Sequence, residues 1–194
     1  LRAVGVTDHE VDFPLLVEST WAVESVVSRF GAGGYALMNP GAAWPNKRWP
    51  PARFGALAAA IRRDHDLTSL VLWGPGEEGL ADAVVAAASG AAALAPPTTI
   101  VDVLGLAREA RLMVSGDTGP LHLAAAMGTP IVSLFGPTQP ERNGPWSAAD
   151  ISLSRAQTCA CLYERQCRRA ARCLDEISVE EVTDAVRRRV SAGG

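Results

Sequence analysis

The chain has 194 residues, of which 48% are hydrophobic and 20% are charged, and its formal net charge is −3 at pH 7. This length is enough to bury a complete core, and a slightly acidic chain lacks the basic surface that non-specific nucleic-acid binding requires. No uncharged apolar run approaches the roughly 18 residues that a membrane-spanning helix needs. We therefore expect a globular domain with no nucleic-acid partner.

The first 34 residues are predicted to be a linker followed by one helix at residues 23–30. From residue 35 onward, short apolar segments alternate with segments of helical periodicity, and the connections between them are short. Such alternation is typical of a parallel sheet with helices on both faces. The predicted strands are residues 35–39, 69–73, 91–94, 111–115 and 130–135, and the predicted helices are 53–63, 77–89, 100–110, a helix that begins after Asp117 and ends at Gly128, and 179–190.

Residues 35–194 are thus expected to form one α/β domain, with a doubly wound, Rossmann-like parallel sheet. Within it, the helix at 100–110 is predicted to turn Val101, Leu104 and Ala107 toward the core. The chain opens without an initiator Met, so we expect it to be a piece of a longer protein.

A polar turn joins a predicted strand to a helix in the sequence Ser115-Gly-Asp-Thr-Gly-Pro-Leu-His122. The first turn of a helix leaves backbone N–H groups unpaired and carries positive dipole charge, so such junctions in open α/β sheets bind phosphorylated ligands. A helix cap alone would account for one of the polar residues here, and Pro120 suits a first turn. It does not account for Asp117, Thr118 and His122 together. We predict a site for an anionic ligand whose hydroxyls Asp117 and His122 hold.

The loop after the first strand brings positive charge to the same edge of the sheet. It has the sequence Asn39-Pro-Gly-Ala-Ala-Trp-Pro-Asn-Lys-Arg-Trp-Pro50, in which Gly41, Ala42 and Ala43 are small enough for a ligand to approach the backbone. Lys47, facing the helix start across a crevice, would clamp a diphosphate and stabilise its charge as it leaves. The alternative is a proline-rich surface loop whose Trp side chains pack on the domain.

Four further segments are ambiguous. Gly74-Pro-Gly-Glu-Glu-Gly79 matches the dinucleotide-binding fingerprint, but its two glutamates would face the pyrophosphate. Asp117-Thr-Gly119 matches the aspartic-protease triplet, which works only as a pair of triplets. Asp64-His-Asp66 resembles a metal-binding motif, yet it lies at a helix end opposite the ligand edge, where a surface turn is expected. The loop Phe135–Trp146 either wraps the crevice or is purely structural.

Cysteines and arginines interleave over residues 159–173. The thiols could form a zinc site, two disulfides or a set of reduced side chains, and their spacing lacks the paired C-x-x-C knuckles of structural zinc sites. The arginines form either a solvated face or a contact for acidic headgroups or phosphorylated glycolipid. These residues are Cys159, Cys161, Cys167 and Cys173, with Arg165, Arg168, Arg169 and Arg172.

Taken together, these segments resemble glycosyltransferase family 9, the ADP-heptose:lipopolysaccharide heptosyltransferases, and especially the heptosyltransferase II branch. That family has a GT-B fold with an acceptor-binding N-terminal half and a donor-binding C-terminal half, and this chain resembles the C-terminal half. The similar segments span roughly residues 35 to 190 and are Asn39-Pro-Gly-Ala, Lys47-Arg-Trp-Pro50, Ser115–His122, Phe135-Gly-Pro-Thr138 and the stretch from Cys173 to Val182.

The resemblance implies that residues 35–194 bind the donor and that the catalytic base, an aspartate, lies in the N-terminal half. No catalytic residue is then expected in this chain, which should bind ADP or ADP-heptose but catalyse poorly by itself. Lys47 would contact the donor diphosphate and support its charge as it leaves. The sugar and phosphates would be held by Asp117, Thr118, Gly119, Pro120 and His122, the nucleoside by Glu77 or Glu78, and Ala42 and Ala43 stand where the family has hydroxyl side chains.

The implied reaction is an inverting transfer of heptose from ADP-heptose to the lipopolysaccharide inner core, without a cofactor or a required metal. It also implies a cytoplasmic protein, with a peripheral contact at the inner face of the inner membrane. Three alternatives are a nucleotide-sugar domain of another GT-B transferase, an NAD-binding domain and a domain that only mediates assembly.

Overall fold

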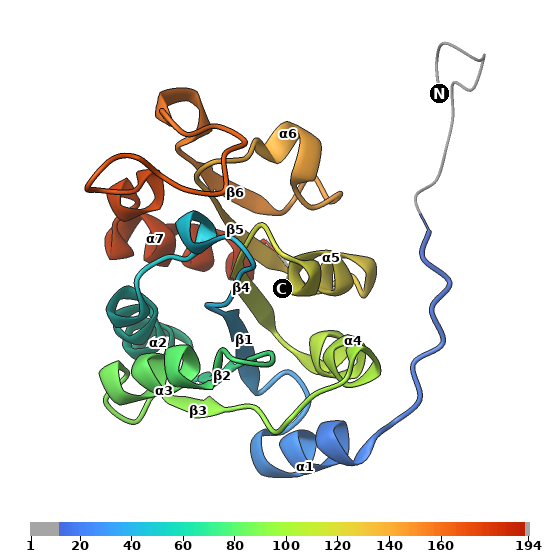
Figure 1. Ribbon diagram of the computed structural model, residues 1–194. Coiled ribbons are helices and arrows are strands. Elements are labelled where there is room, and N and C mark those ends of the chain that lie inside the picture. The colour runs from blue at the N-terminus through green and yellow to red at the C-terminus, as the bar shows by residue number, and fades with distance from the viewer. Residues whose placement is uncertain (1–11, 193–194) are drawn as a thin grey trace, which may run out of the picture.

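The computed structural model describes residues 12–192, which form a six-stranded parallel sheet covered by helices (Figure 1). The strands are β1 (Tyr35–Asn39), β2 (Thr68–Val71), β3 (Ala92–Leu94), β4 (Leu112–Gly116), β5 (Ile131–Phe135) and β6 (Ile151–Ser154). The helices are α1 (Trp21–Phe30), α2 (Pro51–His65), α3 (Glu78–Ala87), α4 (Ile100–Glu109), α5 (Gly119–Ala126), α6 (Pro140–Asn143) and α7 (Val179–Ser191), with the 3-10 turns η2 (Pro45–Lys47), η3 (Ala156–Thr158) and η4 (Cys173–Glu176). The predicted α/β class is confirmed.

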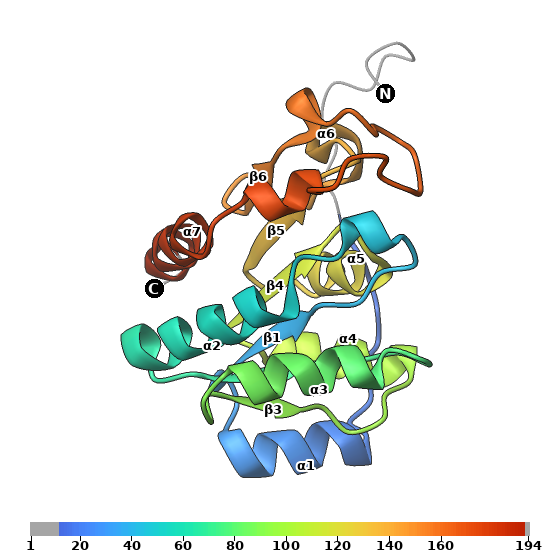
Figure 2. The same ribbon diagram turned by 60° about the vertical axis from the view of Figure 1, so that its left-hand side comes forward.

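The helices form two layers, one on each face of the sheet (Figure 2). Helices α2, α3 and α7 cover one face, where Phe54, Val84 and Val186 belong to one buried cluster with Ala36 and Met38 of β1. Helices α1, α4 and α5 cover the other face, where Val26 and Leu106 share a second buried cluster with Tyr35 and Leu37 of β1. The central strands β1, β4 and β5 are buried on both sides, which accounts for their largely apolar sequences.

The strand order is β3-β2-β1-β4-β5-β6. Strands β2 and β3 therefore lie on one side of β1, and strands β4, β5 and β6 lie on the other. The loops after β1 and β4 therefore diverge at the carboxyl edge of the sheet. In open α/β sheets this switch point is where ligands bind.

Two details differ from expectation. Val101 is 46% exposed rather than buried. Because α4 packs between α1 and α5, its inward face runs through Val103, Leu106 and Ala107 instead. The second difference is β6, a half-buried edge strand that the sequence did not predict. It pairs in parallel with β5, and the hydroxyl groups of Ser133 and Ser152 form a hydrogen bond of 2.8 Å between the two strands.

Within residues 12–192, no helix is both long enough and apolar enough to cross a bilayer.

Candidate functional site

A cavity of about 560 Å³ opens at the carboxyl edge of the sheet, beside the switch point between β1 and β4. Its lining is divided by chemistry. One end is polar and contains Lys47, Asp117 and Thr118 with the start of α5. The other end is mostly apolar and is lined by Leu72, Trp73, Ile100, Val103 and Leu123. The cavity can therefore take a ligand with one anionic part and one flat or apolar part.

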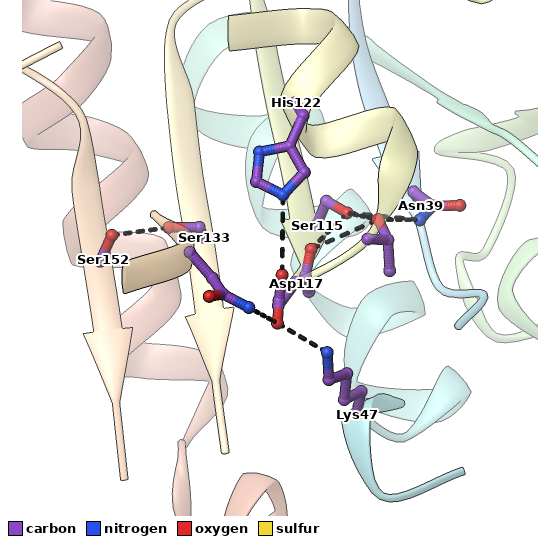
Figure 3. A network of polar contacts seen from close by, with 10 residues as sticks. Asn39, Lys47, Ser115, Asp117, His122, Ser133 and Ser152 are labelled. Atoms are coloured by element: carbon purple, nitrogen blue, oxygen red, sulfur yellow. Dashed lines mark hydrogen bonds and ion pairs between the residues drawn. The ribbon is translucent and has the colours of Figure 1, made fainter. Parts of the chain in front are cut away.

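Asp117 lies at the centre of the polar end, directly after β4 (Figure 3). Its Oδ2 accepts a hydrogen bond from Lys47 Nζ at 2.6 Å and another from Asn143 Nδ2 at 2.9 Å. Its Oδ1 lies 3.7 Å from His122 Nε2. Only 6% of the Asp117 side chain is exposed, so this carboxylate depends on these neighbours rather than on water.

The charge of Asp117 is stabilised by its partners. Burial by itself would raise the pKa of this carboxyl, but the neighbouring His122 imidazole and the hydrogen bonds from Lys47 and Asn143 reverse the effect and hold the pKa well below its usual range. Asp117 is therefore an anion throughout the physiological pH range and forms an ion pair with Lys47 that is largely shielded from solvent.

The start of α5 has no side-chain cap in the part of the chain that the structure describes. Thr118 occupies the cap position, but its hydroxyl accepts a bond from Asn39 Nδ2 at 2.9 Å and lies 3.1 Å from Ser115 Oγ. The two loops are joined in this way across the switch point. Capping therefore does not explain Thr118, and Gly119 and Pro120 at the helix start face the cavity.

The loop that carries Lys47 is held from both sides. Trp49 is buried and its indole N–H donates to the Ile177 carbonyl at 3.0 Å, so this Trp packs on the domain, as the alternative interpretation of the loop expected. On the other side the loop rests on β4, where a Cβ at Gly116 would lie 2.9 Å from the Lys47 carbonyl oxygen. Lys47 itself lies over the Trp44 ring, at 4.4 Å from its centroid.

The structure distinguishes Glu77 from Glu78, between which the sequence could not choose. Glu77 lines the cavity, whereas Glu78 is exposed on α3. The Glu77 carboxylate lies 3.5 Å from Arg48 Nη2 and accepts the Gly74 backbone N–H at 3.3 Å. A Cβ at Gly41 would collide with this carboxylate, so the Glu77 side chain packs directly against the Gly41 backbone and would have to shift if a larger residue stood there. Because Glu77 already occupies the Gly74 N–H, this loop does not present that donor to a pyrophosphate.

Four other residues singled out in the sequence lie in different environments. Ala42 and Ala43 both line the cavity, Ala42 buried and Ala43 exposed. His122 stands beside Asp117 rather than in the cavity wall, with 46% of its side chain exposed. Asp64 pairs with Arg187 at 3.0 Å at the end of α2, as expected for a surface turn.

The four cysteines are free thiols, which corresponds to the reduced alternative. Cys161 Sγ and Cys167 Sγ are 3.1 Å apart, and the hydrogen bond from Cys167 lowers the pKa of Cys161. Burial raises the pKa of Cys173 to about 12. Among residues 12–192, no three histidine, cysteine or acidic side chains have the arrangement of a metal site.

The cysteine-rich segment, residues 159–173, packs against the loops beside the cavity, a contact that the sequence did not predict. Asn46 donates to the Glu164 carbonyl at 2.8 Å, and the Tyr163 N–H donates to the Pro137 carbonyl at 2.7 Å. Arg165 reaches Trp44, at 5.7 Å from the ring centroid. The remaining arginines pair locally: Arg168 with Glu164, Arg169 with Glu176 and Arg172 with Asp175.

The loop Phe135–Trp146, whose role the sequence left open, bonds to the polar end through Asn143 and Asp117, while none of its residues is among those that line the cavity. Sequence reasoning also missed the apolar lining residues, because an apolar residue at a strand end carries no signal that separates a cavity wall from a core. Asn143 had one available signal, its position in a loop after a central strand, but no partner could be assigned to it.

An open parallel sheet with a divided cavity at its switch point and an uncapped helix start beside a Lys–Asp pair is an arrangement typical of nucleotide-binding α/β domains. Comparison with known proteins gives the family. The sequence model of glycosyltransferase family 9 (heptosyltransferase) matches residues 11–171, and the chain belongs to this family.

The regions that match known proteins make up most of this chain but a smaller share of each relative. Lipopolysaccharide heptosyltransferase 1 from Pseudomonas aeruginosa is 31% identical over 133 residues, which are 69% of this chain and 37% of the relative. A family 9 glycosyl transferase from Veillonella parvula superposes with a TM-score of 0.81 at 24% identity, over 98% of this chain and 57% of that one. The E. coli heptosyltransferase WaaC, solved with ADP, superposes with a TM-score of 0.67 at 22% identity, over 81% of this chain and 45% of that one. The structural matches confirm the expected fold, and the chain spans only part of each relative.

Proposed function

We propose that this chain is the donor-binding part of an inverting heptosyltransferase and that its cavity holds ADP-heptose. The observation that carries the proposal is the divided cavity, in which a buried Lys47–Asp117 pair and the free start of α5 stand at one end and an apolar slot with Glu77 at the other. A nucleoside diphosphate sugar has the same division. Family membership and the relative solved with ADP support this choice of nucleotide.

The proposed placement follows the charges. The diphosphate lies between Lys47 and the first turn of α5, where the ammonium and the backbone N–H groups both favour an anion. The adenine lies against Trp73 and Leu72, and Glu77 accepts hydrogen bonds from the nucleoside. Asp117 and His122 are then near the sugar, where an anionic acceptor suits hydroxyl donors. Ala42 and Ala43 offer backbone groups only.

In the proposed reaction, an acceptor hydroxyl attacks the anomeric carbon as its bond to the diphosphate oxygen breaks. The hydroxyl proton passes to a base outside this chain, and ADP departs with the bonding electron pair. Lys47 and the start of α5 stabilise the charge that develops on the departing diphosphate. None of the residues placed here acts as that base, so the chain alone is expected to bind and not to turn over.

The remaining parts of the proposal concern the whole protein. Residues 1–34 would connect to an acceptor-binding half, residues 35–194 would form the donor domain, and the acceptor would be the lipopolysaccharide inner core. Such a protein would work in the cytoplasm at the inner face of the inner membrane. Within the cysteine-rich segment, Arg165 is the arginine left for an anionic surface, since the other three pair with carboxylates.

Calorimetry with ADP, UDP, NAD and ADP-heptose tests the proposal. We expect ADP and ADP-heptose to bind, with UDP and NAD at least about tenfold weaker, a gap of about 1.4 kcal/mol. Equal affinity for ADP and UDP would favour another nucleotide-sugar transferase, and a preference for NAD would favour an oxidoreductase. Absence of any nucleotide binding would overturn the proposal.

A further inference from the structure

Asn143 occupies an unusual position for a neutral side chain. It is the last residue of α6, and its Nδ2 donates at 2.9 Å to the same Asp117 oxygen that accepts the Lys47 ammonium at 2.6 Å. That oxygen therefore carries one charged and one uncharged donor, from two different loops. None of the segments that resemble the family includes Asn143.

The two donors differ in what else they can bind. A phosphate that enters the polar end competes with Asp117 for the Lys47 ammonium, because both anions favour the same cation. If the ammonium turned away and left the carboxylate without a donor, a side chain that is only 6% exposed would remain charged and unpaired, which is strongly unfavourable. An amide does not carry a charge that a phosphate could draw away.

Asn143 is also held in place independently of Lys47. Its backbone N–H donates to the Gln139 carbonyl at 3.1 Å, and the Gln139 side chain accepts the Tyr163 hydroxyl at 3.0 Å. Arg142 stacks on the same Tyr163 ring, 5.5 Å from its centroid. The short helix α6 is thus fixed by the cysteine-rich segment, so the amide stays near Asp117 when the lysine moves.

We propose that Asn143 is a positioning residue, which keeps Asp117 bonded and oriented while Lys47 turns its ammonium toward a bound diphosphate. The inference rests on the proposed function, since it needs a diphosphate at Lys47. A purely structural role for Asn143 makes a different prediction: its removal would then cost the same stability whether or not Lys47 is present.

The test is a cycle of variants in the ligand-free chain, followed by ADP titration. Asn143→Leu keeps the size of the side chain and removes the donor, and Lys47→Met removes the charge. We expect Asn143→Leu to raise the unfolding equilibrium constant at least tenfold more in the Lys47→Met background than in the wild type, because Asp117 then loses both donors to Oδ2. With Lys47 present, Asn143→Leu should weaken ADP binding about tenfold.

Glu141→Gln is the matched control, since Glu141 is exposed on the same helix; its ADP affinity should stay within about twofold of the wild type. Equal stability losses in the two backgrounds would overturn the inference, and so would an unchanged ADP affinity in Asn143→Leu. If the wild type does not bind ADP, the proposed function fails, while the stability cycle still reports whether Asn143 replaces Lys47 as a donor.

Discussion

The two ends of the cavity are built on different principles. At the polar end, side chains from β1, η2, β4, α5 and α6 are joined by short hydrogen bonds around one buried carboxylate. At the apolar end, side chains mostly pack beside one another, and a hydrogen bond from Trp73 to the Ala95 carbonyl at 2.9 Å fixes a ring. The comparison shows that a buried charged group at this site needs several hydrogen-bond partners to be stable, whereas the apolar end is formed by the packing of its side chains.

The largest effect is expected from removing the central charge. Asp117→Asn leaves Lys47 without its carboxylate in a largely buried position, so we expect a loss of about 3 kcal/mol in the free energy of unfolding, measured by urea denaturation. Asp64→Asn, which alters an ion pair on the surface, should cost less than about 1 kcal/mol. Similar losses in the two variants would show that the polar end has no special energetic role.

The same charge makes stability depend on pH. The pKa of Asp117 is lowered in the folded state, so its contribution is present above the unfolded value of about 4 and is lost as pH falls toward the folded value. We expect the stability gap between wild type and Asp117→Asn to be constant near pH 7 and to shrink below about pH 4. Urea denaturation of both proteins across this range measures the gap, and a gap that widens in acid would contradict the assignment.

Lys47→Met should weaken the binding of ligands that carry a phosphate and leave the binding of the nucleoside unchanged. We expect ADP to bind about 30-fold more weakly, a loss of about 2 kcal/mol for a charge-assisted contact, while adenosine binding is unchanged. Calorimetry with both ligands measures this difference. A parallel loss for adenosine would mean that the substitution disturbs the whole cavity.

Trp73→Ala should give the opposite pattern. Loss of a large ring from the slot is expected to weaken ADP and adenosine alike by about tenfold, or about 1.4 kcal/mol, and to leave pyrophosphate binding unchanged. Competition between pyrophosphate and ADP supplies the control measurement. An effect on pyrophosphate would place the ring nearer the phosphates than the proposal does.

The smallest effect is expected outside both ends. Arg168→Gln removes a guanidinium that is 86% exposed and paired with Glu164, so stability should change by less than about 0.5 kcal/mol and ADP affinity should not change measurably. A larger change in affinity would show that the cysteine-rich segment contacts the ligand through this residue.

The polar end was accessible to sequence reasoning and the apolar end was not. Asp117 and Thr118 directly follow a strand and Lys47 lies in the loop after another, and strand–helix alternation predicts a parallel sheet in which both loops leave the same edge. Leu72 and Val103 are apolar residues that fit a core equally well. Asn143 and the cysteine-rich segment lie in irregular loops, whose paths depend on contacts distant in sequence, such as that between Tyr163 and Pro137.

The bond between Trp49 and the Ile177 carbonyl has a practical consequence for dividing this protein. Arg53 donates to the same carbonyl and to that of Asp175, each at 2.7 Å, so the stretch before α7 fastens the base of the loop that carries Lys47. A shortened version that ends after β6 would retain every strand and still lose these anchors. For expression, crystallisation or domain exchange, the boundary must therefore be placed beyond Ile177.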